Sequence, residues 1–309
     1  MPFVMALLSS MLYGVADFLG GIGSRRGHVI VVTAWFQIAG VLPLAVWSFF
    51  APGETRGVDL AWGAAAGVTG GLGVMLLYHA LASGVVSTAA PLISMIALTV
   101  PVLVGLTGGE RPGLLPLVGI ALGCVAVMLI SAHGEPSEHG GGASDASSGA
   151  GAPPGSGDGE SSVASVPTAR PSVTLRSLAP AFGAGILIGL FLVCVARVQP
   201  GSSAWPLVMG RATATVCVFA LLFASRLPLQ PPPATHAPIL GGAITDVSAN
   251  VLYMAAVQRA PMSLIATLVS LAPATTVVLA QVLLRERLGV LQRWGVALAL
   301  VAVVLLSQG

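Results

Sequence analysis

One stretch of the chain occurs twice. When the sequence is compared with itself at a spacing of 176 positions, residues 80–131 align with residues 256–307, and 20 of the 52 aligned pairs are identical. Chance alone would give about five identities in a chain so rich in alanine, leucine, valine and glycine. The chain is therefore expected to fold as two related units, and any function predicted for it should involve both.

The repeated units are predicted to be bundles of membrane-spanning helices. Apolar residues make up 55% of the 309 residues and charged residues only 8%. Several uninterrupted apolar runs are long enough to cross about 30 Å of hydrocarbon. We therefore predict an all-α polytopic membrane protein in a lipid bilayer, with ten transmembrane helices at 3–22, 29–50, 60–82, 85–107, 114–132, 175–198, 203–225, 237–258, 262–284 and 289–307.

The predicted helices form two groups of five. The first five-helix repeat spans residues 1–132 and the second spans residues 175–309. Because five is an odd number, the second group must enter the membrane from the side opposite to the first, so the repeats are predicted to be inverted. Between them, residues 133–174 are dominated by glycine, serine, alanine and proline. This segment has too little apolar surface to offset the entropy of ordering, and we predict a disordered linker.

The composition argues against several classes of protein. The net charge of +2 is small and scattered, so no nucleic-acid partner is expected. The three cysteines lie in apolar runs without the spacing of a metal site, and no metal or cofactor is predicted. The sequence has no P-loop, no GxSxG and no HExxH motif, so we predict no catalytic residues and do not expect an enzyme.

Charged side chains inside the predicted spans mark the candidate site. Asp17, Arg211 and Asp246 each lie within an apolar run, where a charge is tolerated if it faces the protein interior or a wet cavity. Asp246, Asn250 and Tyr253 follow i, i+4, i+7 spacing and share one helical face. We predict that Arg211 pairs with Asp246 or Asp17, or that it binds the carboxylate or phosphate of an anionic substrate. The alternative is a purely structural Arg–Asp pair between two helices.

Three further polar residues extend this predicted site. Tyr13 precedes Asp17 by four residues and shares its helical face. Asp17 could then couple transport to a proton or another cation, whereas the alternative is that it pairs at the nearby membrane interface. Gln37 aligns with Arg211 when the second helices of the two halves are matched. His79, at the end of the third span, is a candidate proton relay, although a lone histidine near a helix end is more commonly an interfacial residue.

Short motifs in a fixed order resemble the EamA repeat of the drug/metabolite transporter superfamily. They are Leu12 to Gly21, Asn250 to Tyr253, Ser270 to Thr275, and the doubled pair Glu110-Arg111 and Glu286-Arg287. The resemblance implies a ten-helix secondary transporter with a central cavity between inverted halves, which moves small metabolites or drugs, often outward. This sequence departs from the family pattern at Gln37, where a basic residue is common in the first half, and in the length of its linker.

The expected function is therefore secondary transport of a small molecule by alternating access. We expect export that can be coupled to a proton or ion gradient. The expected location is the plasma membrane, which in a bacterium is the inner membrane, and the protein is expected to cross it several times. A homodimer is compatible with this expectation. The alternative is a non-transporting membrane sensor or assembly subunit in which the linker is the working part. Orientation stays open, because the arginine distribution favours both termini outside and the resemblance implies both in the cytoplasm.

Overall fold

The computed structural model describes residues 1–82, 86–131, 175–284 and 289–308. The predicted linker and the pair Glu286-Arg287 lie outside these residues. The named elements are all helices: α1 (Pro2–Arg26), α2 (Val29–Phe50), α3 (Gly57–Ala82), α4 (Val86–Thr107), α5 (Leu114–Ser131), α6 (Leu175–Ala196), α7 (Trp205–Ala224), the short 3₁₀ helix η1 (Pro233–Thr235), α8 (His236–Val257), α9 (Met262–Val269), α10 (Ala272–Leu284) and α11 (Val290–Leu306).

Many of these helices have the length and composition of membrane spans. Six stretches of the described residues are long and apolar enough to cross a bilayer, and they belong to α1, α2, α3, α6, α7 and η1–α8. Shorter apolar stretches belong to α4, α5, α9–α10 and α11. The chain is therefore a multi-pass helical membrane protein, as its composition predicted.

The predicted helix 262–284 is divided into two. Helix α9 ends at Val269 and α10 begins at Ala272. Pro273 has no amide hydrogen, and its ring would collide with the carbonyl of Val269 in a continuous helix. At the break, the Leu271 amide donates instead to the Leu268 carbonyl over 3.2 Å, the tighter i to i−3 pattern. Residues at the break, from Val269 to Pro273, contribute to the lining of the cavity described below.

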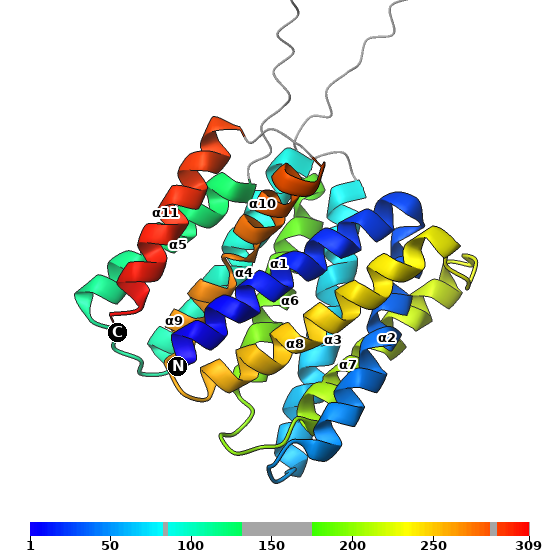
Figure 1. The fold of residues 1–309 in the computed structure, drawn as a ribbon, viewed down its shortest axis with the longest axis horizontal. Helices are drawn as coiled ribbons and strands as arrows, with labels where there is room; N and C mark the ends of the chain where they lie inside the picture. The colour runs from blue at the N-terminus through cyan, green and yellow to red at the C-terminus, as the bar shows by residue number, and fades with distance from the viewer. Residues whose placement is uncertain (83–85, 132–174, 285–288, 309) are drawn as a thin grey trace, which may run out of the picture.

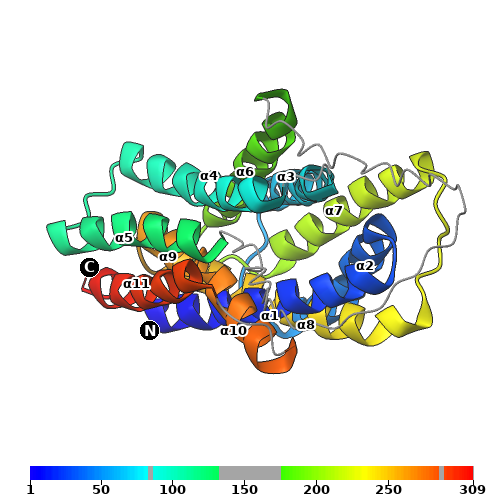
Figure 2. The ribbon, with the colours of Figure 1, turned by 90° about the horizontal axis from the view of Figure 1, so that it is seen from above.

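The helices are arranged in two main layers (Figure 2). Helix α6 packs on α3 and α4 in one layer, and α1 packs on α8 and α10 in the other. The α2–α7 pair closes one side of the bundle, and the α5–α11 pair lies at the opposite side (Figure 1). Helix α9 lies between α4 and α1, and its side chains from Ser263 to Val269 are all buried. A short helix made mostly of apolar residues is suited to such an interior position.

The α5–α11 pair packs reciprocally. A Cβ added at Gly119 would lie 3.1 Å from Cβ of Leu305, and one added at Gly295 would lie 2.9 Å from Cβ of Leu129. Gly119 and Gly295 are equivalent in the internal repeat, and so are Leu129 and Leu305. The beginning of each helix therefore meets the end of the other, and the two helices are antiparallel. The glycines permit this close approach because neither has a side chain.

Candidate functional site

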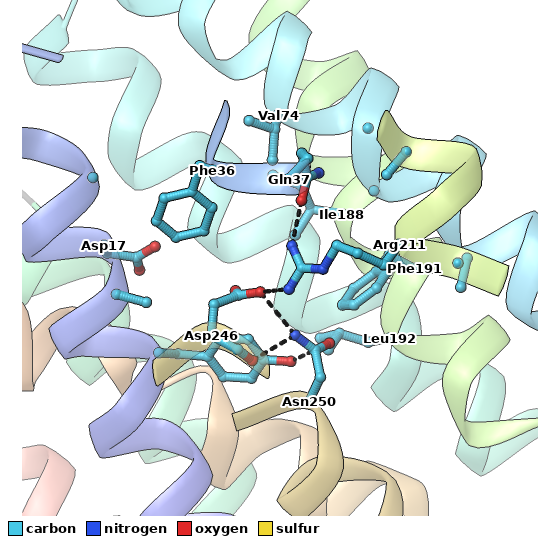
Figure 3. Close-up of a pocket in the computed structure, with 18 of the residues that line it drawn as sticks. Asp17, Phe36, Gln37, Val74, Ile188, Phe191, Leu192, Arg211, Asp246 and Asn250 are labelled. Atoms are coloured by element: carbon cyan, nitrogen blue, oxygen red, sulfur yellow. Dashed lines mark hydrogen bonds and ion pairs between the residues drawn. The ribbon is translucent and has the colours of Figure 1, made fainter. Parts of the chain in front are cut away.

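A cavity of about 810 Å³ lies between the two layers. Its size falls within the range of about 300–1,000 Å³ that is typical of small-molecule sites. The walls are mostly apolar and come from both halves of the chain, with polar side chains gathered around Arg211 (Figure 3). The lining extends toward the α1–α2 connection, where it includes Ser24 and Val29. At the other extreme it includes Leu44 and Val198, which are 1% and 2% exposed.

An ion pair lies in this cavity. Arg211 on α7 is paired with Asp246 on α8 and also donates a hydrogen bond to the Gln37 side chain on α2 (Figure 3). The two charged side chains are 9% and 20% exposed. Gly40, one turn after Gln37, leaves room for the guanidinium, because a Cβ there would lie 3.2 Å from Nε of Arg211. Of the two counter-ions predicted for Arg211, the structure therefore selects Asp246.

Two further side chains hold the ion pair in place. The Asn250 amide nitrogen donates to the backbone carbonyl of Asp246 over 2.7 Å and to its carboxylate over 3.1 Å. The Tyr13 hydroxyl then donates to the Asn250 side-chain oxygen over 2.9 Å. The resulting network contains Tyr13, Gln37, Arg211, Asp246 and Asn250. It joins α1 and α2 of the first half to α7 and α8 of the second.

Asp17 lies apart from this network. It is one turn after Tyr13 on α1, lines the same cavity and is exposed. It makes no hydrogen bond or ion pair with any residue that the structure describes, and no dashed line reaches it in Figure 3. The acidic and basic side chains among the described lining residues are Asp17, Arg211 and Asp246. Because Asp246 neutralises Arg211, the ionised form of Asp17 gives the cavity one uncompensated negative charge.

One predicted site residue lies away from the cavity, and the side chain of another is outside the described part of the chain. Tyr253 is 0% exposed and does not belong to the cavity lining. Its hydroxyl donates to the Leu192 carbonyl over 2.9 Å, which anchors α8 to α6. His79 lies on α3 near the end of that helix, but its side chain is outside the described part of the chain. The network therefore includes five of the eight predicted residues, and Asp17 lines the same cavity.

The cavity wall beside Arg211 depends on glycines that were not predicted as site residues. A Cβ at Gly63 would overlap the Pro206 carbonyl oxygen, and one at Gly67 would overlap the Gly210 carbonyl oxygen. Backbone contact between α3 and α7 is therefore possible only without these side chains. The spacing of four residues between Gly63 and Gly67 is the sequence signal that could have indicated a close helix crossing.

Polar contacts join the two halves at the lower end of the bundle in Figure 1. The hydroxyls of Thr55 and Ser203 lie 2.7 Å apart. Asp59, only 1% exposed, accepts a hydrogen bond of 3.0 Å from the backbone amide of Gln199. These contacts connect the α2–α3 segment to the α6–α7 connection, at the end of the bundle away from the α1–α2 connection (Figure 1).

Glu110 adds a further contact between the halves at this end. Its carboxylate oxygens accept hydrogen bonds from the backbone amides of Met262, over 2.6 Å, and Ser263, over 3.0 Å. These amides begin α9, where the helix leaves N–H groups without intrahelical partners and favours negative charge. A side chain from the α4–α5 connection therefore caps a helix of the second half. We call the Thr55–Ser203, Asp59–Gln199 and Glu110–α9 interactions the inter-half contacts.

The cavity within a bundle of membrane spans places the chain among polytopic membrane proteins with an internal site of ligand size. Comparison with known protein families identifies the family. The model of the EamA-like transporter family matches residues 1–132 and 176–308. The chain belongs to the EamA-like transporter family, which confirms the resemblance seen in the sequence motifs. A crystal structure of a protein with 14% sequence identity matches with a TM-score of 0.68, over 99% of this chain and 97% of that chain, and it supports the fold alone. No curated protein matches the chain.

Proposed function

We propose that the protein is a secondary transporter that carries a small molecule across the membrane by alternating access, with the central cavity as its substrate site. The observation that carries this proposal is a ligand-sized cavity between the two halves of the chain, with an ion-pair network and the unpaired Asp17 on its walls. Transporters of this kind place their sites between repeats, near the middle of the bilayer.

We further propose that residues 1–132 and 175–309 are inverted five-helix repeats. The reciprocal packing of α5 and α11 around Gly119 and Gly295 supports this arrangement. So does the exchange of partners elsewhere, because α1 packs on α8 and α10 while α6 packs on α3 and α4. If α1 corresponds to α6, α3 to α8, and α4 to α9–α10, then each contact has its counterpart in the other half.

The inter-half contacts support a conformation that is closed at one end. They lie beyond Leu44 and Val198, whereas the lining at the opposite extreme reaches the α1–α2 connection. In the alternating-access mechanism, these contacts break when the cavity opens toward the other side. Each contact is small and polar, so it can be exchanged for water without a large change in buried apolar surface.

We propose outward transport in the plasma membrane, coupled to a proton or another cation. Asp17 is the residue that we assign to coupling or substrate binding, because it is the acidic group of the described lining that has no partner. A carboxylate without a partner can take up a proton or a cation on one side of the membrane and release it on the other.

The test is flux in proteoliposomes that contain the full-length protein. A set of radiolabelled amines, amino acids, nucleosides and organic acids would be offered with and without an imposed pH gradient. We expect at least one class of compound to enter the proteoliposomes faster than it enters protein-free liposomes. The Asp246→Ala variant should reduce that flux. If folded, monodisperse protein gives the flux of empty liposomes for every class under both conditions, the proposal is wrong.

A further inference from the structure

We propose that the cargo of the central cavity is a monovalent organic cation with an apolar, aromatic-sized body, whose charged group binds the carboxylate of Asp17. This inference rests on the proposed transport function and assigns a substrate class to the same site. The observation behind it is the charge balance of the cavity.

The charge of the cavity favours a cation. Arg211 is already neutralised by Asp246, and Gln37 accepts a second hydrogen bond from its guanidinium. Asp17 faces the cavity without a partner among the described residues. A charged group in a mostly apolar chamber is poorly solvated, so a cation that approaches it gains more than it would in bulk water.

The same balance disfavours an anion. An anion could reach Arg211 only by displacing Asp246, which would leave two carboxylates and the incoming anion in one apolar space. Truncating or displacing one partner of a buried ion pair leaves the other charge uncompensated. A zwitterion is disfavoured for a related reason, because its carboxylate would find no free cationic group among the described lining residues.

The apolar walls determine the rest of the ligand. The Phe36 ring packs against Gly242, and a Cβ at Gly20, one turn after Asp17, would lie 3.9 Å from that ring. An aromatic face is thus close to the α1 surface that carries Asp17, where it can also contact a bound cation. Phe191 lines the cavity as well, with its ring against Gly70 on α3. These rings and the surrounding aliphatic side chains suit an apolar body attached to the cationic group.

Three probes that share a phenylethyl body test the inference. They are 2-phenylethylamine, which is a cation, phenylalanine, which is a zwitterion, and 3-phenylpropionate, which is an anion. Binding would be measured at neutral pH by isothermal titration calorimetry on the full-length protein in lipid nanodiscs, with empty nanodiscs as the blank. We expect the dissociation constant of the amine to be at least about tenfold lower than that of either other probe. A factor of about ten in the dissociation constant corresponds to the free energy of one hydrogen bond to a charged group.

Variants identify the group that is responsible. Asp17→Asn should weaken amine binding at least about tenfold for the same reason. Asp17→Glu keeps the carboxylate and should retain the preference for the amine. Glu54→Gln makes a matched acid-to-amide change at an exposed side chain outside the cavity, and it should bind as the wild type does.

The inference is overturned if the wild-type protein binds no amine, or if it binds 3-phenylpropionate or phenylalanine as tightly as 2-phenylethylamine. It is equally overturned if folded Asp17→Asn binds the amine like the wild type. Should Asp17→Asn fail to fold, the selectivity of the wild-type and Asp17→Glu proteins among the three probes still decides. Because binding is measured without flux, the proteoliposome assay remains a separate test. Flux of another substrate class without amine binding would uphold transport and refute this inference.

Discussion

At the scale of single residues, the cavity is organised by one ion pair that the internal repeat does not duplicate. Gln37 and Arg211 occupy matched positions in the two halves, and the structure brings them into direct contact. One member of the matched pair is charged and the other is neutral. The asymmetry means that one carboxylate, Asp246, suffices to neutralise the pair, and that Asp17 is left available.

The ion pair makes a prediction about stability. Arg211→Gln and Asp246→Asn each leave one charge uncompensated inside the bundle, so each should lower the free energy of unfolding by about 3 kcal/mol. The double variant replaces the pair by two neutral amides that can hydrogen-bond to each other, and it should lose less than the sum of the two. Denaturant unfolding in mixed micelles, followed by circular dichroism, measures all three. Additive losses would show that the two side chains do not depend on each other.

Sequence spacing grouped Asp246, Asn250 and Tyr253 on one face of α8, and of these three Asp246 and Asn250 line the cavity. Asp246 and Asn250 are four residues apart and share a face and a height on α8, as predicted. Tyr253 shares the face but lies seven residues along, about 10 Å from Asp246 on the helix axis. Helical periodicity predicts which face of the helix a side chain occupies. It does not predict which parts of the neighbouring helices lie opposite that side chain along the helix axis. Tyr253 therefore meets the backbone of α6 in the packed core.

Asp59 could not have been selected from the sequence. It lies in the first turn of α3, the position where acidic residues usually stabilise a helix from its solvated surface. Its burial arises because the α6–α7 connection folds over it and Gln199 donates to it. That contact joins residues that are 140 positions apart in the chain, which is beyond the reach of any local pattern.

At the scale of the elements, hydrophobic length predicted where the helices lie, whereas proline alone did not predict where they break. Pro91 and Pro101 lie within α4, which continues from Val86 to Thr107. Pro273 accompanies the break between α9 and α10. Packing can restore the hydrogen bonds that a proline removes in a membrane helix, so the outcome depends on neighbouring helices and not on the proline itself.

The break makes α9 a separate helix whose beginning needs its own cap. Glu110 supplies that cap, and we predict that Glu110→Ala lowers the free energy of unfolding by about 2 kcal/mol because two amides lose a charged acceptor. Glu110→Gln retains one oxygen acceptor and should lose about half as much. Arg111→Gln changes the exposed neighbouring residue and is the matched control. Equal stability of Glu110→Ala and Arg111→Gln in denaturant unfolding would show that the cap contributes nothing.

At the scale of the whole molecule, the repeat provides the packing frame, whereas the charged side chains of the cavity lie outside the doubled stretch. The identities between 80–131 and 256–307 include Gly119 and Gly295, which bring α5 and α11 together at one side of the bundle. The repeat could therefore be recognised without structure, because packing of equivalent helices constrains equivalent positions in the same way. Asp17, Arg211 and Asp246 lie outside the doubled stretch, and the repeat gave no information about them.

The reciprocal frame predicts matched responses to matched substitutions. Gly119→Ala and Gly295→Ala should each lower the free energy of unfolding by about 1–3 kcal/mol, because the added methyl group meets side-chain and backbone atoms of the facing helix. A Cβ at Gly295 would lie 2.8 Å from the Ile130 amide nitrogen, closer than the 3.1 Å between a Cβ at Gly119 and the Leu306 amide nitrogen. Gly295→Ala should therefore be the more damaging of the two.

Gly57→Ala is the control for this pair, since a Cβ at Gly57 would meet nothing within 4 Å. It should leave the free energy of unfolding unchanged or slightly raised, because alanine favours the helix more than glycine does. Thermal unfolding in detergent, monitored by circular dichroism, ranks the three variants. If Gly57→Ala proves as damaging as the other two, the losses do not report on the α5–α11 contact.

The alternating-access proposal predicts that the inter-half contacts must break in every transport cycle. Thr55 and Ser203 belong to different halves, and their hydroxyls lie 2.7 Å apart, so cysteines at the two positions can approach to disulfide distance. The native Cys124, Cys194 and Cys217 would first be replaced by alanine. Oxidation of Thr55→Cys/Ser203→Cys should then stop flux in proteoliposomes, while a reductant should restore it.

Each single-cysteine protein, oxidised in the same way, should transport normally. Binding of a transported probe to the cross-linked protein should persist, because the cavity keeps its access from the α1–α2 side. Undiminished flux through fully cross-linked protein would show that the two halves do not separate at this end.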